Sequence, residues 1–504
     1  MATRTQIGNA IEEPDLIRSL DIVDNKDNKL DNVGTESTLY TRMKRDNDWD
    51  LIWSLLGGVL RMQREAQVWL PKFKRETQGD YQIRLSQTFL FNGVSGTAKR
   101  LSSKPYQKPV TVAGKFDDEL NVFITDADGK GTSITEFAKN ILMDATQYGL
   151  SHVLVDMPVI QGKISVKEKE ERGLRPKWIH YKALQLFNWE VDENDNLTEI
   201  RLKEWVTEKK GKFGNQRVEQ VRIIRTNDFE LWRRKEGSNE WAMTTDEAVP
   251  HDFGMIPLVT WYTEKTGLLT ANAPLRDLAW TNLEHYISAS DQRAILHIVR
   301  VAILFLKALQ GNDTKGETVV GSNNLIETNN NEADVKFVEH TGAGIEAGER
   351  DLDSLEKRME QQGSQPLIRD RVRTTATANT IGESKAESDV QFWVKNGETV
   401  FNKLFKITAD IMGIKEDTFS DDFKVDIFDD FAISARTVED IKALQTDRML
   451  GVIRTATYLR EARKRGLYGE ELDIDEEIEA TKDEEPNLLT GRQDDKGEPN
   501  EEEN

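Results

Sequence analysis

The sequence predicts a mixed α+β protein whose strands and helices are segregated along the chain. Residues 178–262 contain several runs of partly alternating polar and apolar residues, rich in β-branched and aromatic types, between turn clusters. Residues 275–298 and 381–412 instead repeat apolar residues at helical spacing. We therefore expect an antiparallel strand region followed by a largely helical region.

Length and composition narrow the class of protein. The chain has 504 residues, of which 37% are hydrophobic and 31% charged, enough for two to four structural units. No window reaches the roughly 18 apolar residues that a membrane span needs, and the first residues lack the apolar core of a signal peptide. We expect a soluble, unexported protein. The absence of cysteine excludes disulfides and thiolate metal sites, and the scatter of the six histidines along the chain argues against a zinc site.

Much of the negative charge of the chain lies in residues 467–504. The net charge is −21, and residues 467–504 alone carry sixteen Asp/Glu against three Lys/Arg, a net of −13. This stretch predicts a disordered tail because it has few large apolar residues after Ile478. The remaining body carries −8, which argues against a simple nucleic-acid-binding surface but leaves a DNA conduit open.

The elements expected before residue 178 follow one another closely. An arm over residues 1–45 precedes a helix from Trp49 to Leu70, which Pro71 ends. The further elements are a helix over 81–103, short strands in "KPVTVAG" and "NVFITDADGKGTS", a helix over 135–148 and the strand "HVLVDMPV". In "HDFGMIPLVTWY", Pro257 should stand at a strand start or edge.

The most apolar stretch of the chain, "HIVRVAILFLKALQG", follows the helix over 275–298. After Ile298 the helical stripe gives way to an uninterrupted apolar run with β-branched residues, which we interpret as a buried strand, "VRVAILFL". Periodicity alone does not exclude extra helical turns. With two further strands, "GETVVGS" and "ADVKFVEH", residues 299–341 form a small β insert between helices.

Helices are expected again after this insert. "AGIEAGERDLDSLEKRMEQQG" predicts a charged helix with a thin apolar seam. A loop over 365–380, "QPLIRDRVRTTATANT", precedes the long helix over 381–412 and the strand "FKVDIFDDF". Thr437 and Asp440 form a capping-box start for a helix over 438–449, and Thr455 begins the next helix.

Three motifs resemble ligand-binding sequences but do not predict a site. Gly342, Gly344 and Ala347 match GxGxxA between a strand and a helix, but nearby Glu346 and Glu349 oppose phosphate binding, so a hinge is favoured. "DADGKGTS" and "DENDNLTE" lack the ligands of calcium loops and indicate ordinary turns. No Ser/His/Asp arrangement is legible, and the histidine of Ser151-His152 is expected to be structural. We expect no enzyme, no cofactor and no metal.

The order of these elements resembles the portal proteins of tailed bacteriophages. "VWLPKFKRETQGDYQIRLSQTFLFN" is similar to an N-terminal signature of one portal subfamily, and "HDFGMIPLV" to the segment that ends the portal wing strands. "LEHYISASDQRAILHIVRVAILF", "GAGIEAGERDLDSLEKRMEQQG" and "ATANTIGESKAESDVQFWV" resemble the helices around the insert. "SARTVEDIKALQTDRMLGVIRTATYLREARKRG" is similar to the C-terminal helical region of that family. Together they cover most of residues 49–466.

The resemblance implies the subdomains of a portal subunit. They are an N-terminal arm (1–45), a wing (46–272), a first stem helix (273–298), a clip (299–341), a second stem helix (342–364), a channel loop (365–380), the long wing helix and strand (381–431), crown helices (432–480) and a disordered acidic tail (481–504).

It also implies partners and place. Such proteins form a homo-oligomeric ring, usually a dodecamer, at the portal vertex of the virion capsid, after synthesis in the host cytoplasm. Double-stranded DNA passes through the channel, and the large terminase, the major capsid protein and head-completion or adaptor proteins bind the ring; no membrane is involved. Alternatives are a head–tail adaptor or scaffold ring without a DNA-gating loop, and a virion-associated hydrolase.

Three sets of residues are candidates for function within this scheme. Arg369, Arg371 and Arg373 would point to one side of an extended channel loop, toward DNA or toward acidic residues such as Glu349 or Glu356. Asp277, Glu284 and Asp291, seven apart, would form a stripe lining the stem channel, or a solvated face, or would pair with Arg276 and Arg293 of a neighbour. Val301, Ile303 and Phe305 would lie in the clip, buried between subunits or within one subunit.

Overall fold

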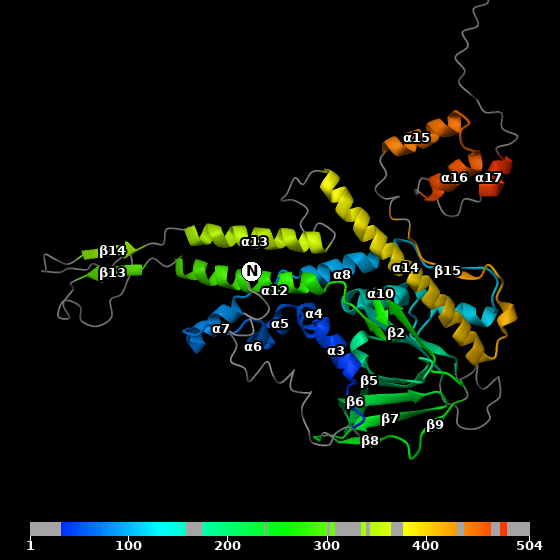
Figure 1. Cartoon of the computed structure of the whole chain (residues 1–504), viewed down its shortest axis with the longest axis horizontal. Helices are drawn as coiled ribbons and strands as arrows, with labels where there is room; N and C mark the ends of the chain where they lie inside the picture. Colours follow the sequence, from blue (N-terminus) through cyan, green and yellow to red (C-terminus); the bar gives the residue numbers. More distant parts are fainter. Residues whose placement is uncertain are drawn as a thin grey trace, which may run out of the picture. The chain divides into compact units, whose positions relative to one another are not determined.

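The computed structural model divides the chain into two compact units, Met1–Asp429 and Asp430–Asn504. It describes residues 32–157, 174–235, 237–238, 240–251, 253–299, 303–307, 334–338, 343–363, 376–429, 431, 438–464 and 474–480. Every strand pair in these ranges is antiparallel. The predicted mixed α+β class with antiparallel sheets is therefore confirmed (Figure 1).

A three-stranded sheet forms the centre of the first unit. Its order is β10 (Leu258–Tyr262), β2 (Leu150–Asp156) and β3 (Lys177–Tyr181). Helices α10 (Ile134–Tyr148) and α14 (Ala376–Met412) pack against it. Pro257 directly precedes edge strand β10, where no ladder hydrogen bond is lost, as the sequence predicted.

Trp178 of β3 is the centre of the core around this sheet. It is fully buried and stacks on Phe123 at 4.9 Å between ring centroids. Phe401 and Phe405 of α14 pack against its ring at 5.8 and 5.2 Å. Its indole nitrogen donates to Thr408 Oγ1 at 2.9 Å, so the polar atom of this large side chain is satisfied.

A second sheet of the first unit contains the predicted meander. β4 (Leu186–Val191), β5 (Leu197–Lys210), β6 (Gly214–Arg225), β7 (Asp228–Arg234) and β8 (Trp241–Met243) pair in chain order, and β9 (Val249–Pro250) pairs with β7. The smaller pairs are β1 (Thr111–Ala113) with β15 (Lys424–Asp426), β11 (Lys265–Gly267) with β12 (Thr270–Ala271), and β13 (Ile303–Lys307) with β14 (Asp334–Val338).

The remaining helical segments that the structure describes in the first unit are mostly short. They are α3 (Thr38–Asp46), α4 (Trp49–Leu56), α5 (Gly58–Arg64), α6 (Ala66–Trp69), α7 (Gln78–Ser86), α8 (Gly93–Ser103), η2 (Lys104–Gln107), η3 (Asp118–Asn121), α9 (Val122–Thr125), η4 (Ala183–Gln185), α12 (Arg276–Val299), α13 (Ala343–Gln362) and η5 (Glu416–Thr418).

Two predicted helices are each divided. The stretch from Trp49 to Leu70 breaks at Gly57–Gly58, where Gly58 has φ +73°, and again at Glu65. The helix predicted over 81–103 is two helices, α7 and α8, because the Asn92 side chain accepts from the backbone N–H of Ser95 at 3.0 Å and begins α8 there.

Three other boundaries differ from the sequence prediction. The prediction of a strand in "NVFITDADGKGTS" is wrong, because Val122–Thr125 is a helical turn. A loop follows this turn, and in it the Asp126 carboxylate accepts a hydrogen bond from the N–H of Gly131 at 2.7 Å. α12 continues to Val299, so the strand of the apolar run begins at Ile303 rather than 299. α14 begins at Ala376, so the last part of the expected loop 365–380 is helical.

Gly397 of α14 allows that helix to approach the central sheet closely. A Cβ at this position would lie 2.1 Å from the buried ring of Trp261, whose indole nitrogen donates to the carbonyl of Trp393 at 3.0 Å. Gly397→Ala is therefore expected to lower the free energy of unfolding by about 1–3 kcal/mol through overpacking, measured by urea denaturation. Gly344→Ala in α13 is the control, because nothing lies within 4 Å and alanine should stabilise the helix slightly. Equal effects of both changes would contradict the prediction.

The second unit contains three described helices, α15 (Val438–Met449), α16 (Thr455–Lys464) and α17 (Ile474–Ala480). The first two begin where the sequence predicted helices. Among the described residues of this unit, the buried apolar side chains are Phe431, Leu459, Ala462 and Ile474. Met449, Leu450 and Val452, at the turn between α15 and α16, are 69–79% exposed in the chain described.

Candidate functional site

Helices α12 and α13 lie side by side and antiparallel, and they form the candidate site with the β13–β14 pair (Figure 1). The direction follows from their polar contacts. Gln292 donates to the carbonyl of Ile345 at 2.9 Å, and Ser288 donates to Asp351 Oδ2 at 2.6 Å. Farther along, His285 Nε2 lies 3.5 Å from Glu356 Oε1.

The seam between the two helices changes character along its length. Near the end of α13, Leu355 and Met359 are buried at 5% and 0% exposure against the apolar side of α12, which includes fully buried Tyr286. Near the start of α13 the contacts are polar, and a Cβ on Gly348 would lie 1.9 Å from Gln292 Oε1. Most other described side chains of α13 are exposed and many are charged, so α13 buries only one narrow stripe.

The first turns of α12 are fixed to the N-terminal helices. Asp48 Oδ2 accepts from Arg276 Nε at 3.0 Å and from Trp280 Nε1 at 2.8 Å. Buried Asn282 donates to the carbonyl of Phe91 at 2.7 Å and accepts from the N–H of Val94 at 3.2 Å. These bonds hold the start of the helix pair rigidly on the body of the unit.

A buried arginine fixes the middle of α12. Arg84 of α7 forms a bidentate pair with Glu76 at 2.8 and 2.9 Å, and their side chains are 4% and 9% exposed. The guanidinium lies 4.1 Å from the ring of Phe73 and 3.4 Å from Ser290 Oγ of α12. Hydrogen bonding to Arg84 holds the pKa of Glu76 below its usual range.

The acidic stripe of α12 is divided by this cluster. Asp277 and Glu284 are exposed, whereas Asp291 is half-buried with Oδ1 4.0 Å from Arg84 Nη1. Burial raises the pKa of Asp291, and Arg84 opposes that rise. Within the described chain Arg276 pairs with Asp48, and Arg293 lies 5.8 Å from the ring of Phe89. That the stripe lines a channel remains a prediction.

The predicted clip strand is present in part. β13 and β14 pair so that Ile303 faces Val338 and Phe305 faces Lys336 across the ladder, which confirms "ADVKFVEH" as a strand. Val301 and the strand "GETVVGS" lie outside the described residues, as do Arg369, Arg371 and Arg373. Burial of the clip residues between subunits and the role of the arginines remain predictions.

Sequence reasoning missed the polar contacts of α12. Arg84 and Ser290 are 206 residues apart, and no periodicity links them. A weak signal existed for His285, since a histidine among the apolar residues of the helix over 275–298 indicates a buried polar contact. His285 is 4% exposed, and it contacts the ring of Phe91, at 5.5 Å between ring centroids, as well as Glu356.

The burial of His285 between α12 and α13 is expected to make the stability of this helix pair sensitive to acid. Burial lowers its pKa, and Glu356 and Asp351 oppose that shift. The folded state therefore binds fewer protons than the unfolded state, so stability falls as pH decreases below the unfolded value of about 6.5. We expect His285→Gln to remove up to about 1.4 kcal/mol per pH unit of this loss between pH 6.5 and 5. Thermal melts across that range measure it, with exposed His297→Gln as the control; an unchanged slope in His285→Gln would refute it.

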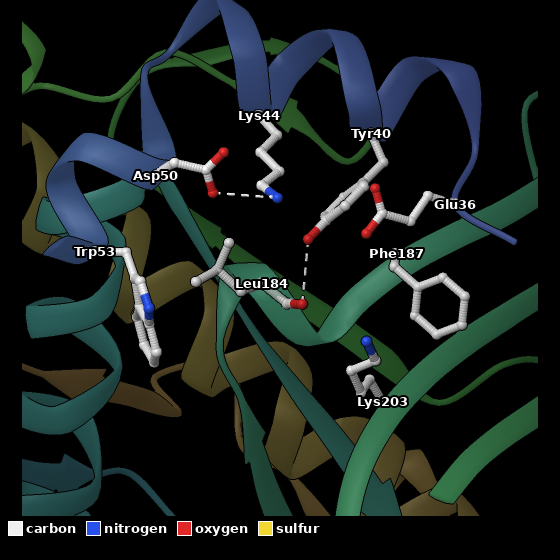
Figure 2. Close-up of a pocket in the computed structure, with 8 residues that line it drawn as sticks. All are labelled: Glu36, Tyr40, Lys44, Asp50, Trp53, Leu184, Phe187 and Lys203. Atoms are coloured by element: carbon white, nitrogen blue, oxygen red, sulfur yellow. Dashed lines mark hydrogen bonds and ion pairs between the residues drawn. The ribbon is translucent and has the colours of Figure 1, made fainter. Parts of the chain in front are cut away.

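A cavity of about 210 Å³ lies between α3, α4 and the strands that follow η4 (Figure 2). Its lining residues are Glu36, Tyr40, Lys44, Asp50, Trp53, Leu184, Phe187 and Lys203. Lys44 pairs with Asp50 at 3.1 Å and Lys203 with Glu219 at 3.0 Å. Tyr40 donates to the carbonyl of Leu184 at 3.2 Å. Because both lysines and the tyrosine hydroxyl are already paired, the cavity offers few free donors for a ligand to bind.

One Ser/His/Asp group in the core has the wrong geometry for nucleophilic catalysis. Ser151 Oγ lies 2.8 Å and Asp144 Oδ2 3.8 Å from the same nitrogen of His180, Nε2, whereas a triad uses opposite ring nitrogens. Ser151 is also fully buried. The neighbouring His152 is structural, as expected: its Nδ1 lies 2.9 Å from Thr260 Oγ1, and burial lowers its pKa to about 3.

The described ranges contain no group of three or more His, Asp or Glu side chains that could hold a metal ion. No helix there combines the length and apolarity needed to cross a membrane.

Comparison with known proteins gives a family match and several loose structural likenesses. The family described as "Domain of unknown function (DUF4055)" matches residues 274–412, which include the helix pair and α14. No curated protein matches the chain.

The structural likenesses are to chains of gene transfer agent particles. A chain of the "Virion of native gene transfer agent (GTA) particle" is similar with a TM-score of 0.39 and 10% identity, covering 74% of this chain and 89% of that one. A chain of the "Neck of native GTA particle computed with C12 symmetry" has a TM-score of 0.36 and 9% identity, with the same coverage.

Proposed function

We propose that this chain is a portal-type subunit, which assembles into a ring at one vertex of a phage-like particle and forms a conduit for double-stranded DNA. Support comes from the ordered sequence resemblance over residues 49–466. The observation that carries the proposal is the arrangement of α12, β13, β14, α13 and α14. In chain order, the two strands β13 and β14 lie between the antiparallel helices α12 and α13, and the long helix α14 follows.

The helix pair suits a ring better than a single subunit. α13 covers little apolar surface of its own chain, and its exposed side is rich in charged residues, so neighbouring pairs can stand around a water-filled channel. The bonds of Asp48 and Asn282 hold the start of α12 on the body. The pair is therefore braced at one end, as a wall of a channel must be if DNA moves past it.

The exposed acids of α12 have the sign that a conduit needs. In our proposal, Asp277 and Glu284 face the channel, about 10 Å apart along the helix axis. Repeated around a ring, they repel phosphates and prevent DNA from binding tightly to the wall. Asp291 contributes less because it is half-buried beside Arg84.

The chain itself performs no chemistry in this scheme and needs no cofactor. ATP hydrolysis belongs to the terminase, which docks on residues 299–341, and head-completion proteins replace it after packaging. The major capsid protein surrounds the ring in the virion.

The test is the oligomeric state of the purified full chain. Native mass spectrometry and electron microscopy should find a ring of about twelve copies with a central hole, with α12 on its inner wall. A compact monomer or dimer would refute the proposal. A ring with Asp277 and Glu284 on the outer surface would refute the channel role of the stripe.

The three arginines provide a functional prediction. Replacing Arg369, Arg371 and Arg373 with Ala should leave rings intact and reduce DNA packaging or retention at least about tenfold, because guanidinium–phosphate contacts inside the ring are lost. Packaged DNA is measured by nuclease protection, and replacing all three with Lys is the control that keeps the charge. If the Ala variant fails to form rings at all, the arginines are structural, bridging to acids such as Glu349 or Glu356.

A further inference from the structure

The hairpin between β5 and β6 forms a basic finger, defined here as residues 207–217. The two strands have 14 and 12 residues and pair in continuous register from Glu199↔Arg225 to Lys210↔Gly214. At the tip, Phe213 is 90% exposed, the most exposed of the large apolar side chains in the described chain. An apolar ring in this position is covered by no other described residue of its own chain.

The finger is positively charged in an acidic protein. Residues 207–217 contain four basic residues and one acid, Glu208, and therefore have a net charge of +3, whereas the whole chain has −21. The basic residues are Lys209, Lys210, Lys212 and Arg217. Glu208 is engaged by Arg233 at 2.5 Å. Lys212 lies 5.3 Å from the ring of Phe213, so cation and aromatic ring are presented together.

The base of the finger is stiffened, so its tip is held in place. Arg217 lies 4.8 Å from the ring of Trp205, which is 51% exposed on the same ribbon. Arg233 joins Glu208 of β5 to Gln220 of β6, at 2.5 and 2.9 Å. A rigid ribbon that ends in one aromatic side chain among cations has the composition of a protein-interface anchor with a charged rim.

The segment with matching chemistry is in the chain itself. Residues 481–504 contain nine Asp/Glu against three Lys/Arg, and the apolar pair Leu488 and Leu489 stands between two acidic groups. We propose that the basic finger binds the acidic segment 481–504 of a copy of this chain, with Phe213 against the leucine pair and the lysines against the flanking carboxylates.

This partner fits better than an extended polyanion. A DNA duplex or an anionic membrane presents negative charge over a large area, and the remainder of an acidic chain repels it. A short acidic segment presents its charge only at the finger. A lone phenylalanine also inserts too little apolar surface for stable membrane anchoring.

Carbodiimide cross-linking of the full chain tests the contact directly, because it joins lysine amines to carboxylates only where they touch. Mass spectrometry should find Lys209 or Lys212 joined to acids in 483–503, with yields that fall at least about fivefold in 1 M salt. Phe213→Ser keeps every lysine and should lower the yield about threefold or more. A mixture of ¹⁴N and ¹⁵N chains identifies whether one copy or two are joined. Absence of these cross-links, or finger cross-links to other acids instead, would overturn the proposal.

A spin label tests the charge requirement without relying on lysine chemistry. The chain has no cysteine, so Thr490→Cys, directly after the leucine pair, gives a single labelling site and leaves both leucines in place. The label should be immobilised in the otherwise unchanged chain and freed when Lys209, Lys210 and Lys212 become Glu. Lys72, Lys74 and Arg75 changed to Glu form the matched control, since they are also exposed and surround an aromatic residue, Phe73.

Two results of the labelling experiment would overturn the proposal. Equal release by both triple variants would mean that the tail follows overall charge and not the finger. Binding of a duplex oligonucleotide that only the finger variant loses, with the label mobile throughout, would assign the finger to nucleic acid instead.

Discussion

Arg84→Met is expected to lower the free energy of unfolding of the first unit by about 3 kcal/mol or more, because it leaves the Glu76 carboxylate buried without its partner. Both side chains are nearly inaccessible, and the guanidinium also donates to the carbonyl of Pro71 at 3.2 Å. The change therefore leaves both the Glu76 carboxylate and the Pro71 carbonyl without the hydrogen bonds that Arg84 donates. It should also loosen α12, since the contacts with Ser290 and Asp291 are lost. Urea denaturation and hydrogen exchange of α12 amides measure the two effects.

The double variant Arg84→Met, Glu76→Leu separates the ion pair from packing. Replacing a buried pair by apolar side chains is often neutral, so the double variant should recover most of the lost stability. The pH dependence provides a second measurement. Because the pKa of Glu76 is lowered in the folded state, its stabilisation is present above the unfolded value of about 4.3 and is lost as pH falls through the folded value. That loss should be smaller in Arg84→Met. A single variant as stable as the unchanged chain would refute the role of the cluster.

Long periodic elements were predictable from sequence because one face of each is buried against something. The apolar repeats of α10, α12 and α14 predicted helices close to where they lie. The errors occur where a local contact overrides the periodicity. Gly58 in the left-handed region and the Asn92 side chain both interrupt apolar patterns that continue across them.

The candidate site was predictable as a set of elements but not as a set of contacts. The two helices and the strand "ADVKFVEH" follow from pattern and turn signals, whereas the pairing of the helices was expected only from the family resemblance. The Arg84 cluster does not, because its members come from segments far apart in the chain. The acidic stripe shows the consequence: seven-residue spacing treats Asp277, Glu284 and Asp291 as equivalent, whereas Arg84 and burial distinguish the third.

Ile303→Asp is expected to abolish or greatly weaken ring assembly. Among the residues that the structure describes, β13 and β14 pair only with each other, and an isolated pair of this size is at best marginally stable in water. The apolar run "VRVAILFL", which contains the start of β13, therefore needs additional apolar contacts, and neighbouring copies supply them in our proposal. An aspartate at position 303 would place an unpaired charge in that contact and cost several kcal/mol per copy.

The measurement compares assembly with folding in the same variant. Native mass spectrometry should show monomers in place of rings, while circular dichroism of Ile303→Asp stays close to that of the unchanged chain, because the rest of the first unit has its own core around Trp178. Ile303→Val is the matched control, since it keeps a β-branched apolar side chain and should assemble. Because each copy in a ring contributes to two contacts, the defect multiplies around the ring, so a partial weakening of one contact already disfavours closure. Misfolded monomers would mean that the strand is buried within its own subunit, and rings like those of the unchanged chain would refute the interface.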